Sequence, residues 1–304
     1  MKSGFVGLIG RPNVGKSTLI NSIIGKKISI TSDKPSTTRN IIQGIYNTQD
    51  TQIIFVDTPG IHKSKNKLGK VLNKQAFFTI DDVDVLLFLT DASTPLGKGD
   101  KFIIDLLENI TKPVILILNK IDKIKKGEIL PKIEEYSKLY NFSEIIPISA
   151  LKKDNTDHLI KVLEGYLPDS IPYFDSNTVT SSTNEFLISE LVREKVLELT
   201  NDEVPHSVTC VTEEINYSKT SINIRCLIIV DRENLKGIII GHNGNMIKEI
   251  GTRARTDIEE LLGKKVYLEL LVKVVPKWRD REKIINEMGY NCLLYTSDAA
   301  DDKA

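Results

Sequence analysis

The feature that most constrains this chain is a glycine-rich loop near its N-terminus, with the sequence Gly10-Arg11-Pro12-Asn13-Val14-Gly15-Lys16-Ser17. An apolar run, residues 5–9, precedes the loop, and an amphipathic run, residues 18–25, follows it. Strand, glycine-rich loop and helix is the order of a phosphate-binding loop, because the loop N–H groups and the helix N-terminus all point at an anion. We therefore predict that this loop binds the phosphates of a nucleotide.

Single residues of the loop have separate predicted roles. Gly10 and Gly15 lack a Cβ atom, so the backbone can approach a phosphate closely. We expect the Lys16 ammonium to reach the β- and γ-phosphates and to act in catalysis, and the Ser17 hydroxyl to be a ligand of Mg²⁺. The alternative is an ordinary glycine turn between a strand and a helix.

Bulk properties narrow the class of protein. A chain of 304 residues suggests about two domains. The formal net charge is zero, so binding to nucleic acid or to anionic lipid requires a local patch. Cys210, Cys226 and Cys292 have no metal-binding spacing and indicate reduced thiols. We expect a cytoplasmic protein without a signal peptide or a transmembrane segment.

Apolar runs and helical stretches alternate through the first half of the chain. We predict strands at residues 41–46, 52–56, 83–90, 114–118 and 145–148, and helices at residues 102–110, 129–140 and 157–167. The first two of these strands flank a polar tip and predict a hairpin. The unbroken apolar runs indicate strands buried on both faces, and hence an α/β domain with a doubly wound, mostly parallel sheet.

Polar motifs follow the predicted strands, where open α/β sheets bind ligands. The first is Asp57-Thr58-Pro59-Gly60. We expect Asp57 to hold Mg²⁺ through water. We expect the Gly60 N–H to donate a hydrogen bond to the γ-phosphate, and this contact to be lost on hydrolysis. One such motif alone is a weak signal, because turns often contain Asp, Pro and Gly.

Two further motifs predict recognition of guanine. In Asn119-Lys120-Ile121-Asp122, the Asp122 carboxylate can accept hydrogens from N1 and the 2-amino group of guanine, a pair that adenine lacks. We expect Asn119 to brace the loop. A backbone N–H of the Ser149-Ala150-Leu151 segment can donate to guanine O6. Four motifs in this order on successive strands are a much stronger signal than any one alone.

Two polar segments beside these motifs are candidate switches. Residues 32–40 contain a proline and show no periodicity; a surface loop is the default interpretation, and a first switch whose threonine closes over Mg²⁺ is the alternative suggested by position. We favour Thr38 over Thr37 for this ligand. Residues 62–73 are lysine-rich and follow Gly60; their position suggests the second switch, and a solvated charge run is the default interpretation. We expect His62 to be solvated, with a catalytic base as the alternative.

Together the four motifs and the segment Ser36-Thr37-Thr38-Arg39-Asn40 resemble the TrmE–Era branch of translation-associated GTPases. Ile61 stands where Ras-like enzymes carry a glutamine that orients water. Asn13 stands where potassium-assisted members of the branch have an asparagine, so the resemblance implies a K⁺ site; an ordinary loop residue is the alternative. The implied GTP-binding residues are Gly10, Arg11, Pro12, Asn13, Val14, Gly15, Lys16, Ser17, Asp57, Thr58, Pro59, Gly60, Ile61, Asn119, Lys120, Ile121, Asp122, Ser149 and Ala150. The implied catalytic residues are Lys16, Thr38 and Gly60.

The second half of the chain begins after a stretch of small polar residues, 175–184, with linker composition. We predict a helix at residues 186–199 and strands at residues 207–215, 221–230 and 266–274, with a helix, a GxxG loop and a second helix before the last strand. This frame resembles a type II KH domain, a small α+β domain whose glycine loop clamps a nucleic-acid backbone; an inert α+β domain is the alternative. The implied RNA-binding residues are Gly241, His242, Asn243, Gly244, Lys248 and Arg253.

Over residues 1–290 the chain closely resembles the Era family. We expect an Era-type G domain at 1–172, a linker at 173–185, a KH domain at 186–290, and a non-family, artefactual and disordered tail at 291–304. The resemblance implies a monomeric GTPase that uses Mg²⁺, binds the 3′ region of 16S rRNA, assists assembly of the 30S subunit and contacts the inner face of the membrane peripherally. The alternatives are a nucleotide-sensing RNA-binding module with little turnover, and a paralogous ribosome-assembly GTPase acting on another RNA.

Overall fold

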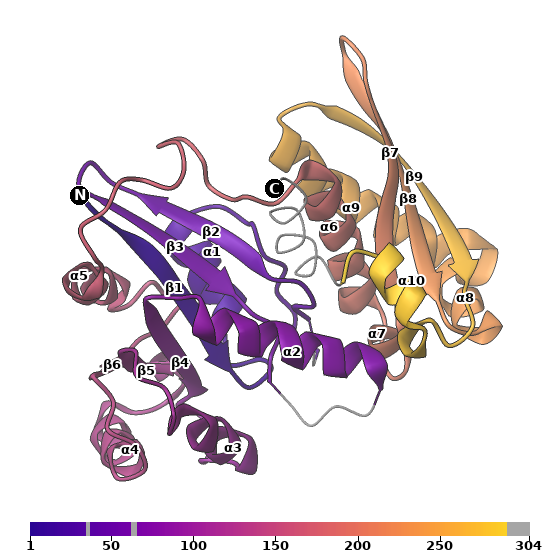
Figure 1. Ribbon diagram of the computed structural model, residues 1–304. Coiled ribbons are helices and arrows are strands. Elements are labelled where there is room, and N and C mark those ends of the chain that lie inside the picture. The colour runs from indigo at the N-terminus through magenta and orange to yellow at the C-terminus, as the bar shows by residue number, and fades with distance from the viewer. Residues whose placement is uncertain (35–36, 62–65, 291–304) are drawn as a thin grey trace, which may run out of the picture. The chain divides into compact units, whose positions relative to one another are not determined.

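The structure is a computed structural model that describes residues 1–34, 37–61 and 66–290. The chain forms two compact units whose main division falls between Ser181 and Ser182 (Figure 1), and the described residues of Ser32–Thr37 and Lys65–Val71 group with the second unit. Within the described ranges, no helix combines the length and the apolar character needed to cross a membrane. Predictions for His62 and for residues 291–304 lie outside the described residues.

The first unit is built on a six-stranded sheet with the order β2-β3-β1-β4-β5-β6. All neighbouring pairs are parallel except the β2–β3 hairpin. Chain order reverses on either side of β1, so the carboxyl end of β1 lies at a topological switch point, where such sheets bind ligands. The strands are β1 (Lys2–Gly10), β2 (Ile42–Asn47), β3 (Thr51–Asp57), β4 (Val85–Asp91), β5 (Val114–Asn119) and β6 (Glu144–Pro147).

Helices cover both faces of this sheet, as Figure 1 shows. Apolar side chains of α1 and α5 pack on one face, and those of α2, α3 and α4 pack on the other. Two short 3₁₀ turns, η1 and η2, follow β5. The helical segments are α1 (Lys16–Ile24), α2 (Lys67–Asp81), α3 (Lys98–Leu107), η1 (Ile121–Lys123), η2 (Lys126–Glu128), α4 (Ile129–Ser137) and α5 (Thr156–Tyr166).

The predicted doubly wound sheet and its hairpin are confirmed, but helix α2 was missed. The lysines of residues 62–73 favour a solvated charge run or a switch segment over a helix. Buried Leu68, Leu72, Ala76 and Ile80 recur every fourth residue along α2. This apolar stripe is the signal that could have revealed the helix.

Part of the predicted linker is bound to the first unit. The Gln52 side chain accepts from the backbone N–H groups of Tyr173 and Phe174, at 2.7 and 3.0 Å. Further along, the Ile45 N–H donates to the Val179 carbonyl at 2.9 Å. Residues 173–181 therefore run along the β2–β3 hairpin and partly pair with the edge strand β2, which protects that edge.

The second unit contains a three-stranded sheet in the order β7-β8-β9, antiparallel between β7 and β8 and parallel between β8 and β9. Alternate residues of β8, from Ile222 to Ile228, are buried, and α6 and α9 contact the sheet. The elements are α6 (Asn184–Leu199), α7 (Val204–Ser207), β7 (Thr209–Tyr217), β8 (Ser221–Val230), α8 (Glu233–Ile240), η3 (His242–Gly244), α9 (Asn245–Leu262), β9 (Lys265–Val274), η4 (Trp278–Asp280) and α10 (Glu282–Glu287).

This element order matches the expected KH frame, and the α+β assignment is confirmed. The structure adds α7 and the C-terminal turns η4 and α10. Trp278 and Tyr290 are buried and stack with ring centroids 6.2 Å apart. The Tyr290 hydroxyl also shares a 2.6 Å hydrogen bond with Thr209. The segment that follows β9 is thus part of the core of the second unit. Cys210 and Cys226 are buried in this unit.

Candidate nucleotide and nucleic-acid sites

The predicted phosphate-binding loop leaves the carboxyl end of β1 and leads into α1. Gly15 has a φ of 101°, in the left-handed region that favours glycine. A Cβ atom on Gly10 would lie 2.5 Å from the Leu89 carbonyl oxygen, so this position also requires glycine. The Lys16 ammonium folds back across the loop and donates to the carbonyls of Gly10 and Arg11, at 3.3 Å each.

Lys16 lies in a site that disfavours its charge. Burial lowers the pKa of the Lys16 ammonium, and the nearby Asp57 carboxylate acts in the opposite direction. A bound polyphosphate would supply further negative charge at this position. The electrostatics of the loop therefore suit an anionic ligand.

Side-chain oxygens of Ser17, Thr38 and Asp57 meet at the start of α1. The Ser17 hydroxyl donates to Asp57 Oδ2 at 2.7 Å and lies 3.0 Å from the Thr38 hydroxyl. Ser29, which the sequence analysis missed, also donates to Asp57 Oδ2, at 2.9 Å. The Thr37 hydroxyl instead donates to the Lys34 carbonyl. The geometry thus brings Thr38, and not Thr37, to this cluster.

Asp57 fits a hard cation. Asp57 has no exposed surface, and burial raises the pKa of its carboxyl group. The charge of Lys16 and the hydroxyl groups that contact Asp57 act in the opposite direction on this pKa. The Asp57 Oδ1 atom is buried and has no hydrogen-bond partner among the residues that the structure describes. A buried carboxylate oxygen with nothing to bind is costly, and Mg²⁺ takes oxygen ligands from one or two carboxylates, hydroxyls, water and phosphate. The residues present therefore fit a Mg²⁺ site.

Asn119 joins three of the predicted motifs. Its Nδ2 donates to the Val14 carbonyl at 2.8 Å, and its Oδ1 accepts from the N–H groups of Lys120 and Ala150, at 2.8 and 3.0 Å. The end of β5 is thereby tied to the phosphate loop and to the segment after β6. Because the Ala150 N–H already has this partner, it must share its hydrogen if it also donates to guanine O6.

The residues predicted to recognise the base lie at the same edge of the sheet. The Ser149 hydroxyl donates to Asp122 Oδ1 at 2.5 Å, which orients the carboxylate. Lys120 has a φ of 66° and its ammonium contacts the Asn13 carbonyl at 2.7 Å and Asp91 at 2.6 Å. Ile121, which lies between them, opens the short turn η1.

Asp91 was not predicted as part of the site. Burial raises the pKa of its carboxyl group, but hydrogen bonds from Lys120 and Ser93 and the charge of Lys120 outweigh burial and lower it. The signal for Asp91 was its position at the end of β4, since the other parallel strands of the sheet also end in polar motifs.

The Asp57-Thr58-Pro59-Gly60 turn packs against the phosphate loop. The Thr58 hydroxyl donates to the Leu8 carbonyl at 2.6 Å. A Cβ on Gly60 would lie 2.9 Å from the Pro12 backbone nitrogen, so only glycine permits this approach. Ile61 is 2% exposed and belongs to the hydrophobic core. Pro59, between these residues, is also buried.

The GxxG loop of the second unit joins α8 to α9. Gly241 and Gly244 have φ values of 73° and 77°, and Asn243 has a φ of 50°. A Cβ on Gly241 would lie 2.6 Å from Met246 Cβ, whereas the space beside Gly244 is open. His242 and Asn243 are exposed. The loop therefore presents bare backbone and two exposed side chains at the N-terminus of α9.

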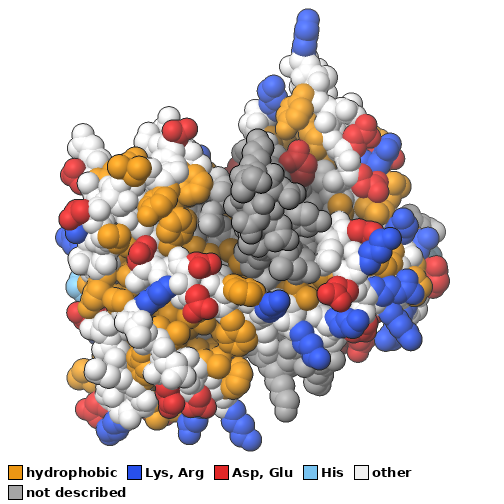
Figure 2. All heavy atoms as spheres, viewed as in Figure 1, with side chains coloured by type: hydrophobic (Ala, Val, Ile, Leu, Met, Phe, Trp, Pro, Cys, Tyr) orange, Lys and Arg blue, Asp and Glu red, His pale blue; other side chains and the backbone are white. Residues whose placement is uncertain are grey.

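Cations near this loop differ in availability. Lys248 is exposed, whereas Arg253 pairs with Glu249 at 2.8 Å. Figure 2 shows further Lys and Arg side chains gathered over the part of the second unit that carries α8 and α10. The second unit therefore has a local basic surface, although the whole chain is neutral.

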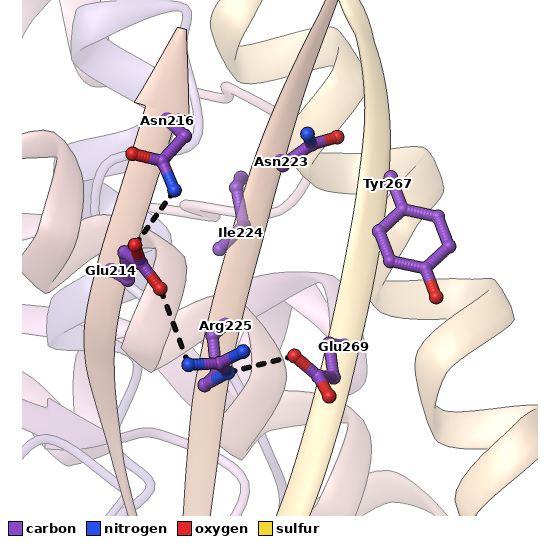
Figure 3. Close-up of a pocket in the computed structure, with 7 residues that line it drawn as sticks. All are labelled: Glu214, Asn216, Asn223, Ile224, Arg225, Tyr267 and Glu269. Atoms are coloured by element: carbon purple, nitrogen blue, oxygen red, sulfur yellow. Dashed lines mark hydrogen bonds and ion pairs between the residues drawn. The ribbon is translucent and has the colours of Figure 1, made fainter.

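The outer face of the second unit's sheet has a hollow of about 320 Å³ (Figure 3). Arg225 crosses it between two carboxylates, Glu214 at 3.3 Å and Glu269 at 2.7 Å. Tyr267 is 67% exposed beside them. Two acids against one base give this surface the wrong sign for a phosphate backbone, so we do not assign RNA binding to it.

Fold and site together define the class: a phosphate-binding-loop GTPase domain followed by a KH domain. The family model of "50S ribosome-binding GTPase" matches residues 5–120, and that of "KH domain" matches residues 203–279. A crystal structure of Era with MgGDPNP and nucleotides 1506–1542 of 16S ribosomal RNA is 44% identical, with a TM-score of 0.93, over 95% of this chain and 99% of that one. A variant of Aquifex aeolicus Era bound to GDP and AlF₄⁻ is also 44% identical over the same shares, with a TM-score of 0.92. The chain belongs to the Era family of GTPases.

Proposed function

We propose that this Era-family GTPase couples the state of its bound nucleotide to binding of the 3′ region of 16S rRNA, and so assists maturation of that RNA and assembly of the 30S subunit. The observation that carries the proposal is the presence, in one chain, of the Ser17–Thr38–Asp57 cluster and the exposed GxxG loop. The similar Era structure with both MgGDPNP and 16S rRNA nucleotides supports it.

In the proposed site, Ser17 and Thr38 hold Mg²⁺ directly and Asp57 holds it through water. The ion neutralises charge on the β- and γ-phosphate oxygens when it is bound. Lys16 moves from its loop carbonyls to the phosphates, and the Gly60 N–H donates to the γ-phosphate. Loss of that phosphate releases Thr38 and Gly60, which is the change a switch requires.

Because Ile61 is buried in the core, its side chain cannot orient the attacking water. We propose that K⁺, bound beside Asn13, supplies positive charge at the transferring phosphate. Asn13 stands at the turn of the phosphate loop with a φ of 65°. The proposal includes a monomer that acts in the cytoplasm on the 30S subunit, with peripheral contact at the inner face of the cell membrane.

Two measurements test the proposed function. Multiple-turnover phosphate release should require Mg²⁺, and the affinity for a 16S 3′-region RNA should differ between the GDPNP-bound and the GDP-bound protein. Equal RNA affinity in both states would contradict the coupling, and absence of turnover would favour the nucleotide-sensing module. A crosslinking map of bound rRNA would identify a paralogue that acts on another RNA.

A further inference from the structure

Arg11, the second residue of the phosphate loop, is directed at the start of α3. Its Nε donates to Asp100 Oδ1 at 2.8 Å, and its Nη2 donates to the Thr94 hydroxyl at 3.2 Å. The Arg11 side chain is 28% exposed, whereas Asp100 has no exposed surface. The loop is thus tied by a charged pair to an element that contributes none of the four nucleotide-binding motifs.

The start of α3 is shaped to receive this arginine. Asp100 Oδ2 accepts from the Gly97 N–H at 2.9 Å, so one carboxylate oxygen caps the helix and the other holds Arg11. A Cβ on Gly99 would lie 2.7 Å from Arg11 Cδ, and one on Gly97 would lie 3.1 Å from Arg11 Nη1. Glycine at both positions leaves room for the arginine stem and guanidinium.

Arg11 and Lys120 anchor the loop at two successive places. Lys120 holds the Asn13 carbonyl and is itself paired with Asp91. Arg11 holds the loop one residue before Pro12, and its own carbonyl accepts from Lys16. Pro12, which packs against Gly60, lies between the two anchored residues.

We propose that Asp100 is a positioning residue for GTP hydrolysis, acting through Arg11. It fixes the entry of the phosphate loop, so that the loop N–H groups, Lys16 and Asn13 keep their geometry around the transferring phosphate. Removal of the Arg11 charge leaves the fully buried Asp100 carboxylate without its charged partner, and a shift of about 1 Å in a positioned group can cost about 100-fold in rate. The inference rests on the assignment of residues 10–17 as the phosphate-binding loop.

The test is a double-mutant cycle in the full-length protein with Asp100→Asn, Arg11→Gln and the two combined. Asn retains an oxygen for the Gly97 N–H but carries no charge for Arg11. We expect each single variant to lower kcat for GTP at least about tenfold, with a smaller change in KM. We expect the double variant to be no worse than the poorer single variant, because both changes break one interaction.

The matched control is Glu128→Gln. Asp100 is the third residue of α3, and Glu128 is the third residue of the short turn η2. The Glu128 carboxylate accepts from the Lys125 N–H at 2.7 Å. The Glu128→Gln change removes a capping charge at a site that is distant in the chain from the phosphate loop, so kcat should equal that of the wild type. Arg11→Lys, which keeps the charge, should be more active than Arg11→Gln.

Several outcomes would overturn the proposal. Asp100→Asn with wild-type kcat would do so, and so would losses that simply add in the double variant. If Asp100→Asn does not fold, Arg11→Gln and Arg11→Lys decide: wild-type kcat in both excludes the positioning role. Lys16→Ala separates this failure from failure of the site itself, since a Lys16 variant with normal turnover would show that the loop does not bind the phosphates.

Discussion

Charged side chains that are buried gather at one end of the first unit's sheet. Lys16, Asp57 and Asp100 are at most 6% exposed, and each lies in or beside the phosphate loop. Burial disfavours the charge on Lys16 and on Asp57, as their pKa shifts indicate. Such an arrangement is unfavourable for the empty site and favourable once Mg²⁺ and phosphate balance the charges, so nucleotide binding should stabilise the first unit by mass action.

The proposed role of Asp122 in selecting the base leads to the first prediction. Asp122→Asn replaces one carboxylate acceptor by a donor, which repels the 2-amino group of guanine but suits the oxygen of xanthine. We expect affinity for GTP to fall and affinity for xanthosine triphosphate to rise, measured by titrating both nucleotides. The matched control is Asp154→Asn, the same change at a residue whose backbone pairs with Ser149. An unchanged preference for GTP would contradict the assignment.

The second prediction concerns potassium at Asn13. Wild-type hydrolysis should be faster in K⁺ than in Na⁺ at equal ionic strength, because only a well-fitting cation stabilises the transferring phosphate. Asn13→Ala should remove this difference. Alanine is strained at a φ of 65°, but that strain is the same in both salts, so the ratio of the two rates isolates the ion. Equal wild-type rates would exclude a K⁺ site.

At the scale of elements, helix α6 opens the second unit with a threonine cap. The Thr183 hydroxyl accepts from the Phe186 N–H at 3.3 Å. Thr183→Ala should lower the free energy of unfolding of this unit by about 1 kcal/mol, while Thr183→Ser should retain most of it. The only tryptophan, Trp278, is buried in the second unit, so its fluorescence during urea unfolding reports on that unit alone. Equal urea midpoints for the wild type, Thr183→Ala and Thr183→Ser would show that the Thr183 hydroxyl does not stabilise the start of α6.

The elements could largely be predicted from sequence because their signals are local. Unbroken apolar runs revealed β4 and β5, and strand-ending motifs revealed Asp57 and Asp122. Helix α2 was not predicted because its four buried apolar residues are interspersed with lysines, which indicate a solvated segment. The sequence did not indicate roles for Ser29, Asp91 and Asp100. Their roles depend on contacts with residues far away in the chain, and a local sequence pattern carries no information on such contacts. The bound part of the linker escaped because small polar residues also favour flexible segments.

At the scale of the whole molecule, the two units should be separable by mutation. His242→Asp with Asn243→Asp places two negative charges on the GxxG loop, against the RNA backbone. Because Asp tolerates the left-handed conformation at residue 243, the loop should keep its shape. We expect a loss of affinity of at least about tenfold for a 16S 3′-region RNA at matched salt, with normal GTP binding and a normal melting temperature, measured by filter binding and calorimetry.

The control for this variant is Thr220→Asp with Asn223→Asp. Both residues are exposed at the β7–β8 hairpin, and the change in net charge is the same. RNA affinity of the control should stay near that of the wild type. A GxxG variant that binds RNA as well as this control would exclude the loop as the RNA clamp, even though the KH fold stands.

The paired segment after Phe174 has a consequence for proteolysis. Ser181 still bonds to Gln43 at 2.8 Å, and Thr183 already caps α6, so only Ser182 separates two ordered attachments. A protease needs an extended, accessible stretch of backbone, and a polar region of this composition would normally offer one. Limited digestion should therefore spare the boundary between the GTPase and KH units until residues 173–181 detach from β2, and the rate of cutting there would measure how often they do.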